Sequence, residues 1–244
     1  MPPVGRGRAV VSPGRGRGLL SRAPSRPSTP IAVDRTTRPG TARPRPEDPL
    51  RLWTIRSGPE RALLEQRGVL RTDGRRISRY RQDAYAWMGE QLAKRVGPPP
   101  PGCRYPLWAW VQYGGEGRPQ PDLRARGHCP PGTRAIRIEA VLPRRSVLLS
   151  DFQKWHAVLN RTYLADSERD ARAFERALRR AGVTDAWPYP EPFASRVIQS
   201  WERVFELSGD DESYWGPARE RQLQAVFWEL HAAQVRRLTP FVAR

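Results

Sequence analysis

The sequence predicts an α+β fold, a single compact domain of mixed short strands and helices that follows a disordered tail. Three observations lead to this prediction. Residues 1–49 contain ten arginines, no aromatic residue and frequent Pro and Gly. From residue 50 onward, segments with strand-like alternation lie among segments with helical periodicity. These segments do not follow the regular strand–helix–strand order of a parallel sheet, which favours α+β over α/β.

The N-terminal tail, residues 1–49, carries ten arginines against three acidic residues, so it supplies +7 of the chain's net charge of +18. It has too few apolar residues to offset the entropy lost on ordering, which predicts disorder. Its Gly-Arg repeats at 5–8 and 14–18 are similar to segments that hold RNA phosphates without sequence preference. We therefore expect at most weak nucleic-acid contact here. A plain solvated tail, or a start codon assigned too far upstream, is the alternative.

Composition limits what the charge and the cysteines can mean. Lys94 and Lys154 are the only lysines, and such an arginine bias beside abundant Ala, Gly and Pro is typical of a GC-rich genome. The charge is therefore weak evidence for a phosphate-binding surface. Cys103 and Cys129 lack zinc-ligand spacing and are predicted to be free thiols. No segment approaches the ~20 apolar residues of a membrane span, which predicts a cytoplasmic protein without membrane contact.

The elements of the domain follow from local patterns. Residues 52–55 are rich in β-formers and predict a strand, and Pro59 then opens a helix. Gly68 ends that helix before a short strand at 69–70. The next predicted elements are a helix at 78–96, a strand at 105–113, a loop at 114–133, strands at 135–142 and 147–149, and helices at 151–160, 167–181 and 192–207.

The segment 222–230 is ambiguous between helix and strand. Its apolar residues recur at helical spacing, but the run at 224–230 is also rich in β-formers. We predict a strand here, then a helical turn at 232–236 and a final strand that runs through Phe241.

The densest cluster of polar and aromatic residues surrounds the start of the helix at 151–160. Ser150, with Gln153 three residues on, forms a capping box. In a catalytic interpretation, Asp151 orients His156 as a general base, with Trp155 nearby. In the structural interpretation, Ser150 and Asp151 cap the helix and His156 makes a hydrogen bond in the core. The structural interpretation is the preferred one.

Two further features suggest ligand contact. Trp108 and Trp110 share one face of the strand at 105–113, where they form either a stacking platform for a base or nicotinamide or a part of the core. Arg124 lies on the loop at 114–133. It either clamps a phosphate or carboxylate or is simply solvated. No metal site is predicted.

Six segments, each containing tryptophan, occur in order after the tail. They are LWTIRS (52–57), AYAWMGEQLAKRVGPPP (84–100), YPLWAWVQY (105–113), VLLSDFQKWHAVLN (147–160), VIQSWERVFEL (197–207) and LQAVFWELHAAQVRRLTPF (223–241). Together they resemble an uncharacterised bacterial family, domain of unknown function 3841. The resemblance covers most of residues 50–244 and implies one shared domain. It implies no chemistry, because the family is uncharacterised.

A second similarity lies in the first and last elements. A strand with the polar Thr54, then a short helix ending at 68–70, is similar to the entry of ADP-ribosyltransferase-like folds. A closing strand followed by Val235 and Leu238 is similar to their exit. The first strand lacks the usual His or Arg unless Arg56 serves. The similarity implies that NAD or a related nucleotide binds in an aromatic-lined cleft.

Enzymes of that class usually carry a late-strand Glu, which stabilises the oxocarbenium-like ribose as nicotinamide leaves. Here the corresponding place holds Gln222 or Gln224, with Glu220 or Glu229 nearby. The residues implied as catalytic are Glu229, His156 and Gln224. Those implied as ligand-binding are Thr54, Tyr85, Trp108, Trp110, Arg124, Asp151 and Trp155. The competing hypothesis is a non-catalytic module whose basic surface binds nucleic acid or an acidic protein.

Overall fold

The computed structural model describes residues 48–208 and 211–244, and all of these lie in one compact unit. The tail predicted for 1–49 lies outside the described residues as far as residue 47. The helices and strands are β1 Pro49–Ser57, α1 Gly58–Arg67, β2 Val69–Leu70, α2 Gln82–Arg95, β3 Leu107–Gln112, β4 Arg134–Pro143, β5 Leu148–Asp151, α3 Phe152–Leu159, α4 Glu168–Arg180, α5 Phe193–Ser200, α6 Glu212–Trp215, β6 Leu223–Phe227, β7 Leu230–His231 and β8 Val235–Val242.

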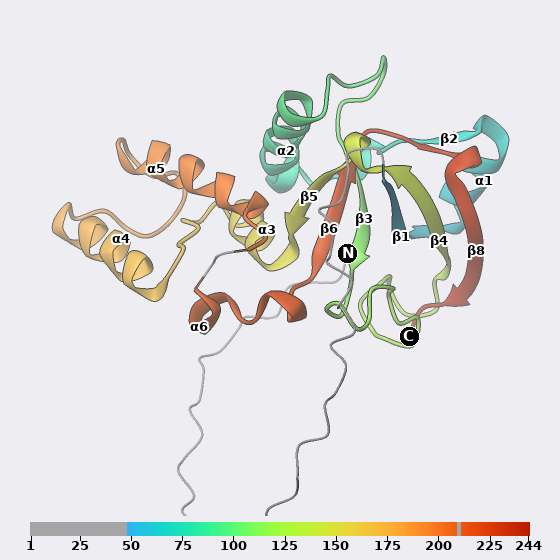
Figure 1. The fold of residues 1–244 in the computed structure, drawn as a ribbon. Helices are drawn as coiled ribbons and strands as arrows, with labels where there is room; N and C mark the ends of the chain where they lie inside the picture. The colour runs from blue at the N-terminus through green and yellow to red at the C-terminus, as the bar shows by residue number, and fades with distance from the viewer. Residues whose placement is uncertain (1–47, 209–210) are drawn as a thin grey trace, which may run out of the picture. The chain divides into compact units, whose positions relative to one another are not determined.

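Six of these strands form one antiparallel sheet in the order β5–β6–β3–β1–β4–β8 (Figure 1). β1 pairs with β4 along its whole length, but it meets β3 only where Trp53 lies opposite Trp110. β2 and β7 form a separate two-stranded ladder. Helices combined with an antiparallel sheet confirm the predicted α+β class.

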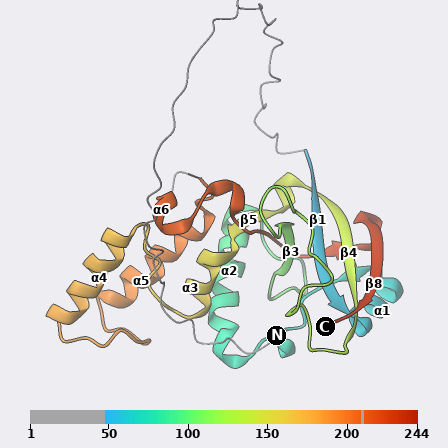
Figure 2. The same cartoon turned by 90° about the horizontal axis from the view of Figure 1, so that it is seen from below.

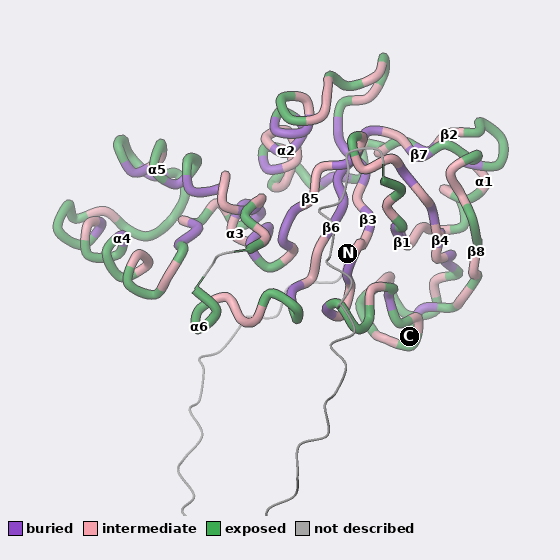
Figure 3. The backbone as a smooth tube through the Cα atoms, in the orientation of Figure 1, coloured by how far each residue is buried: buried purple, intermediate pink, exposed green. Residues whose placement is uncertain are grey.

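A hydrophobic core lies on each face of the sheet. On one face, alternate strand residues such as Leu52, Ile138 and Phe227 pack with Leu64 of α1 and Leu70 of β2. The other face, over β5, β6 and β3, packs against helices, as Figure 2 shows for α2 and α3. This second core extends into α4 and α5 through buried residues that include Phe174, Leu178 and Val197. The outer turns of α4 are exposed (Figure 3).

The C-terminal strands differ in one respect from expectation. A strand over 224–230 is confirmed as far as Phe227, where β6 ends. The indole Nε1 of Trp228 then donates to the carbonyl oxygen of Gly97 at 2.9 Å. The chain turns at this point, so Leu230 pairs with Leu70 in the smaller ladder instead of extending β6. One predicted strand is therefore two strands in two sheets.

The predicted helices are confirmed with small corrections at their ends. The helix expected at 192–207 is α5 followed by a 3₁₀ helix, Trp201–Phe205. The helix expected from residue 78 is α2, preceded by a 3₁₀ turn at Arg79–Arg81. The short helix α6 was not predicted. Among the described helices, none is both long enough and apolar enough to cross a membrane.

Candidate ligand-binding site

One row of side chains crosses all six strands of the sheet. Directly paired residues of antiparallel strands point to the same face, with Cβ atoms about 5 Å apart. The row lies on the face that carries α2 and α3, because it contains Gln224, two residues from Val226 of that core. Its members, from β5 to β8, are Ser150, Gln224, Trp110, Trp53, Glu139 and Arg237.

An aromatic cluster adjoins this row. Trp108 lies two residues from Trp110, and its ring centroid is 4.7 Å from that of Trp155 on α3. Tyr85 of α2 packs edge-on against both, at 5.9 Å and 6.0 Å. Burial raises the pKa of the Tyr85 hydroxyl, so it stays protonated at neutral pH. Trp110 itself packs edge-on against Phe152 at 4.8 Å. The structure thus gathers four of the predicted ligand-binding residues.

Several buried polar atoms of this face have no hydrogen-bond partner within the described residues. They are Nε1 of Trp53, Oε1 of Gln224 and Oγ of Ser150 on the row, and Nε1 of Trp108 beside it. A buried polar group left without a partner costs about 1–3 kcal/mol. Such groups are rare in folded proteins and call for an explanation, and the capacity to bind a ligand is one. Their concentration on one face marks it as a candidate site.

Thr54 points to the opposite face of the sheet, and its side chain forms a hydrogen bond with the backbone of β3. Its Oγ1 donates to the backbone oxygen of Trp108 at 2.9 Å, and Nη2 of Arg56 donates to the same oxygen at 3.2 Å. These side chains take the place of strand–strand hydrogen bonds where β1 and β3 diverge. Burial lowers the pKa of Arg56, although Glu60, 3.4 Å away, offsets part of this effect. Thr54 and Arg56 therefore position Trp108.

Asp151 and His156 do not form the predicted catalytic pair. Asp151 is the N-cap of α3, where its Oδ1 accepts hydrogen bonds from the backbone nitrogens of Gln153 at 2.8 Å and Lys154 at 3.1 Å. The predicted capping box at Ser150 is thus wrong, since Asp151 is the N-cap and the Ser150 hydroxyl bonds to no backbone nitrogen among the described residues. Nδ1 of His156 lies 2.9 Å from the carbonyl oxygen of Phe152, one turn earlier in the same helix.

Glu229 lies apart from the other predicted site residues. It follows the end of β6, where the chain turns toward β7, so it has no place in the row that contains Gln224. Its Oε1 accepts from Nε of Arg71 at 2.6 Å, and its Oε2 lies 3.2 Å from Nε2 of His231. The carboxylate that does lie on the row is Glu139, which is 3.5 Å from Arg51.

Arg124 lies on the loop between β3 and β4, where it pairs with Asp122. Its Nε and Nη2 each donate to the Asp122 carboxylate at 3.0 Å. These hydrogen bonds hold the pKa of Asp122 at about 2. The guanidinium is therefore already engaged by a carboxylate, and Arg124 is not part of the row.

Sequence reasoning missed two members of the row, Trp53 and Arg237. Each lies on a correctly predicted strand, so the elements were known but the pairing was not. Alternation along a single strand shows which residues share a face, and Trp53 alternates with the core residue Leu52. Alternation cannot show which strands are neighbours.

The fold and the site define an α+β protein with an aromatic and polar row on the helix-covered face of an antiparallel sheet. No group of His, Cys, Asp and Glu within the described residues is arranged to hold a metal ion. The chain matches the family model described as Domain of unknown function (DUF3841) over residues 51–236, and it belongs to this family. No curated protein and no solved structure matches it.

Proposed function

We propose that the domain binds a nucleotide, with NAD as the first candidate, over the part of the row from Ser150 to Trp53. The observation that carries this proposal is the set of buried polar atoms without partners beside Trp110. A nucleobase or nicotinamide ring has a flat face that stacks on an indole and a polar edge. Trp110 offers the flat indole face, and its neighbours in the row, Gln224 and Trp53, offer the polar atoms.

The polar atoms suit a carboxamide such as that of nicotinamide. Oε1 of Gln224 can accept a hydrogen bond from an amide NH₂ group, and Nε1 of Trp53 can donate one to an amide oxygen. Gln224 and Trp53 flank Trp110 in the row, so both lie within reach of a ring stacked on it. The Ser150 hydroxyl can either donate or accept a hydrogen bond.

The row continues toward a cation that suits a diphosphate. Arg237 lies two strands beyond Trp53, roughly 10 Å away at the usual strand spacing. It is exposed and has no ion pair among the described residues. NAD is long enough to place its ring at Trp110 and its phosphates near Arg237.

Transfer of ADP-ribose is a separate hypothesis, in which Glu139 is the carboxylate nearest the ribose.

The proposal is tested by titrating the full chain with NAD, AMP and nicotinamide in a calorimeter. We expect NAD to bind, and we expect Trp110→Leu and Gln224→Met each to weaken binding at least about tenfold through loss of stacking or of the carboxamide contact. Trp187→Leu, at an exposed tryptophan outside the site, is the matched control and should bind normally. Absence of binding at millimolar concentrations of all three ligands would overturn the proposal.

The competing binding-module hypothesis gives a different pattern. A basic surface that holds nucleic acid binds a single-stranded oligonucleotide with an affinity that falls steeply as salt is added. Trp110→Leu would leave that affinity unchanged.

Release of nicotinamide from NAD by the wild type, and not by Glu139→Gln, would support transferase activity. A cytoplasmic location accompanies the proposal, because the free Cys103 and Cys129 stay reduced there.

A further inference from the structure

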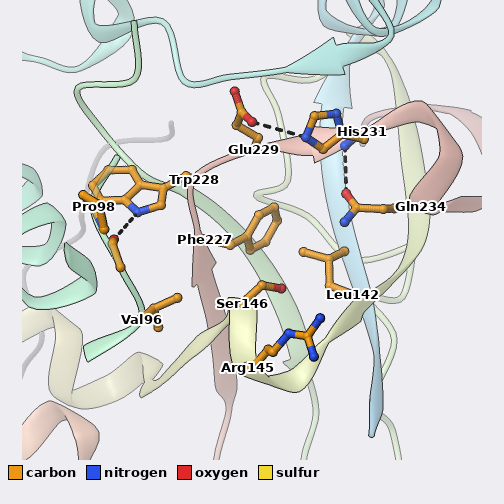
Figure 4. A pocket seen from close by; sticks show the side chains of 11 residues that line it. Val96, Pro98, Leu142, Arg145, Ser146, Phe227, Trp228, Glu229, His231 and Gln234 are labelled. Atoms are coloured by element: carbon orange, nitrogen blue, oxygen red, sulfur yellow. Dashed lines mark hydrogen bonds and ion pairs between the residues drawn. The ribbon is translucent and has the colours of Figure 1, made fainter. Parts of the chain in front are cut away.

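A cavity of about 470 Å³ lies where the end of β6 leads into β7 (Figure 4). Its volume is within the range of roughly 300–1,000 Å³ that is usual for small-molecule sites. Apolar walls come from three elements and include Val96, Leu142 and Phe227. Polar side chains occupy two opposite sides, with Glu229, His231 and Gln234 on one and Arg145 on the other.

The carboxylate of Glu229 contributes no uncompensated negative charge to this cavity. Nη2 of Arg71 lies 2.5 Å from its Oε1, and Nε2 of His231 lies 3.2 Å from its Oε2. The Cys103 thiol also lies 3.8 Å from Oε1. The carboxylate is therefore neutralised by Arg71, which does not line the cavity, and both of its oxygens are engaged.

A reciprocal capping box fixes the orientation of His231 and Gln234. The backbone nitrogen of His231 donates to Oε1 of Gln234 at 2.8 Å, and the His231 ring accepts from the backbone nitrogen of Gln234. Because Nε2 of His231 faces Glu229, the nitrogen that accepts in the capping box is Nδ1. The Gln234 amide nitrogen is left as a donor that makes no hydrogen bond among the described residues.

Arg145 gives the cavity its charge. It is exposed, and its guanidinium makes no ion pair with any carboxylate of the described residues. Figure 4 shows it across the cavity from Gln234, with Leu142 between them in this view. With Glu229 balanced by Arg71, one positive charge and one amide donor remain. The cavity therefore offers donors, one excess positive charge and apolar walls.

We propose that this cavity binds a small organic monocarboxylate with an apolar body. Arg145 would take the carboxylate in a bidentate pair, which is the geometry that guanidinium and carboxylate groups favour. Val96, Leu142 and Phe227 would contact the apolar body, and the Gln234 amide would donate to a polar substituent or to the carboxylate. This site is distinct from the tryptophan row and does not depend on nucleotide binding there.

The test uses the full chain and a fluorinated probe, 4-fluorophenylacetate, followed by ¹⁹F NMR line broadening. The neutral 4-fluorophenylacetamide has nearly the same shape and is the matched ligand. We expect the acid to bind at least about tenfold more tightly than the amide, because only the acid forms the charged pair. Arg145→Gln should abolish that preference. Arg180→Gln, at an exposed arginine of α4, should retain it.

A second variant tests the cavity itself. Val96→Phe fills the apolar end, so it should weaken both probes while circular dichroism remains unchanged. Equal affinity for acid and amide, no binding of either, or a preference unchanged in Arg145→Gln would overturn the proposal. NAD titration of Arg145→Gln separates the two sites, since nucleotide binding on the tryptophan row should be unaffected.

Discussion

At the scale of single residues, Ser150 shows how the candidate site departs from an ordinary core. Its hydroxyl is completely buried and has no hydrogen-bond partner within the described residues. Ser200, at the end of α5 and beside the same core, shows the usual arrangement. It donates to the carbonyl oxygen of Val197 at 2.6 Å and accepts from the backbone nitrogen of Leu164 at 2.9 Å. The hydroxyl of Ser200 thus has hydrogen-bond partners among the described residues, and the hydroxyl of Ser150 has none.

This contrast predicts that replacing the two serines by alanine changes the free energy of unfolding in different ways. Ser150→Ala removes an unsatisfied buried hydroxyl, so the free energy of unfolding without ligand should stay the same or rise by up to about 1 kcal/mol. Ser200→Ala breaks two hydrogen bonds and should lower it by about 1–3 kcal/mol. Urea unfolding measures both. Equal destabilisation by the two variants would show that Ser150 has a partner in the protein and would weaken the case for a site.

At the scale of elements, helix α1 depends on a charged capping box. Oε2 of Glu60 accepts from the backbone nitrogen of Ser57 at 3.0 Å and from its Oγ at 2.8 Å. Burial raises the pKa of Glu60, but Arg56 and these hydrogen bonds outweigh burial, so the pKa lies below its usual value. A carboxyl group of this kind stabilises the fold above its ordinary pKa of about 4.3. That contribution is lost as the pH falls through the lowered, folded-state pKa.

Glu60→Gln therefore has a pH-dependent effect. Glutamine can still complete a capping box, so the variant removes mainly the charge beside Arg56. At pH 7 we expect a loss of about 1–2 kcal/mol in the free energy of unfolding, which should disappear under acidic conditions where Glu60 is protonated. Glu65→Gln, in an exposed pair with Arg61, should cost less than about 0.5 kcal/mol at any pH. A pH-independent loss at Glu60 would contradict this account.

The elements were largely predictable because their signals are local. The core positions Phe174 and Leu178 lie four residues apart in α4, and Arg134–Pro143 alternates along β4. Where local signals compete, the prediction failed. Ser150 and Asp151 are both good caps, and only the hydrogen bonds of the Asp151 side chain to the backbone nitrogens of Gln153 and Lys154 show that the helix starts one residue later. The row as a whole could not be predicted, since it depends on strand order and register.

At the scale of the whole molecule, the two hydrophobic cores share their central strands. In β6, Ala225 and Phe227 enter one core while Val226 enters the other. Loss of packing on either face therefore disturbs the same strand. The described residues should consequently unfold as one cooperative unit, although the helices α4 and α5 contribute to only one of the cores.

Two matched substitutions test that cooperativity. Leu52→Ala in one core and Leu178→Ala in the other should each lower the free energy of unfolding by about 2–5 kcal/mol. In both variants, tryptophan fluorescence and far-UV circular dichroism should report the same urea midpoint. Two separated transitions in Leu178→Ala would show that the helical region unfolds independently, and would contradict the account.

The central claim is that the unpartnered groups around Trp110 bind a nucleotide ring, and NMR of the tryptophan indole N–H groups tests it most directly. The signals are assigned with single Trp→Phe variants of the full chain and followed as NAD is added. We predict that Nε1–H of Trp53 moves downfield as it gains a hydrogen bond, while Nε1–H of Trp201, which already donates to the carbonyl oxygen of Thr162, stays in place. An unchanged Trp53 signal at saturating NAD would contradict the claim.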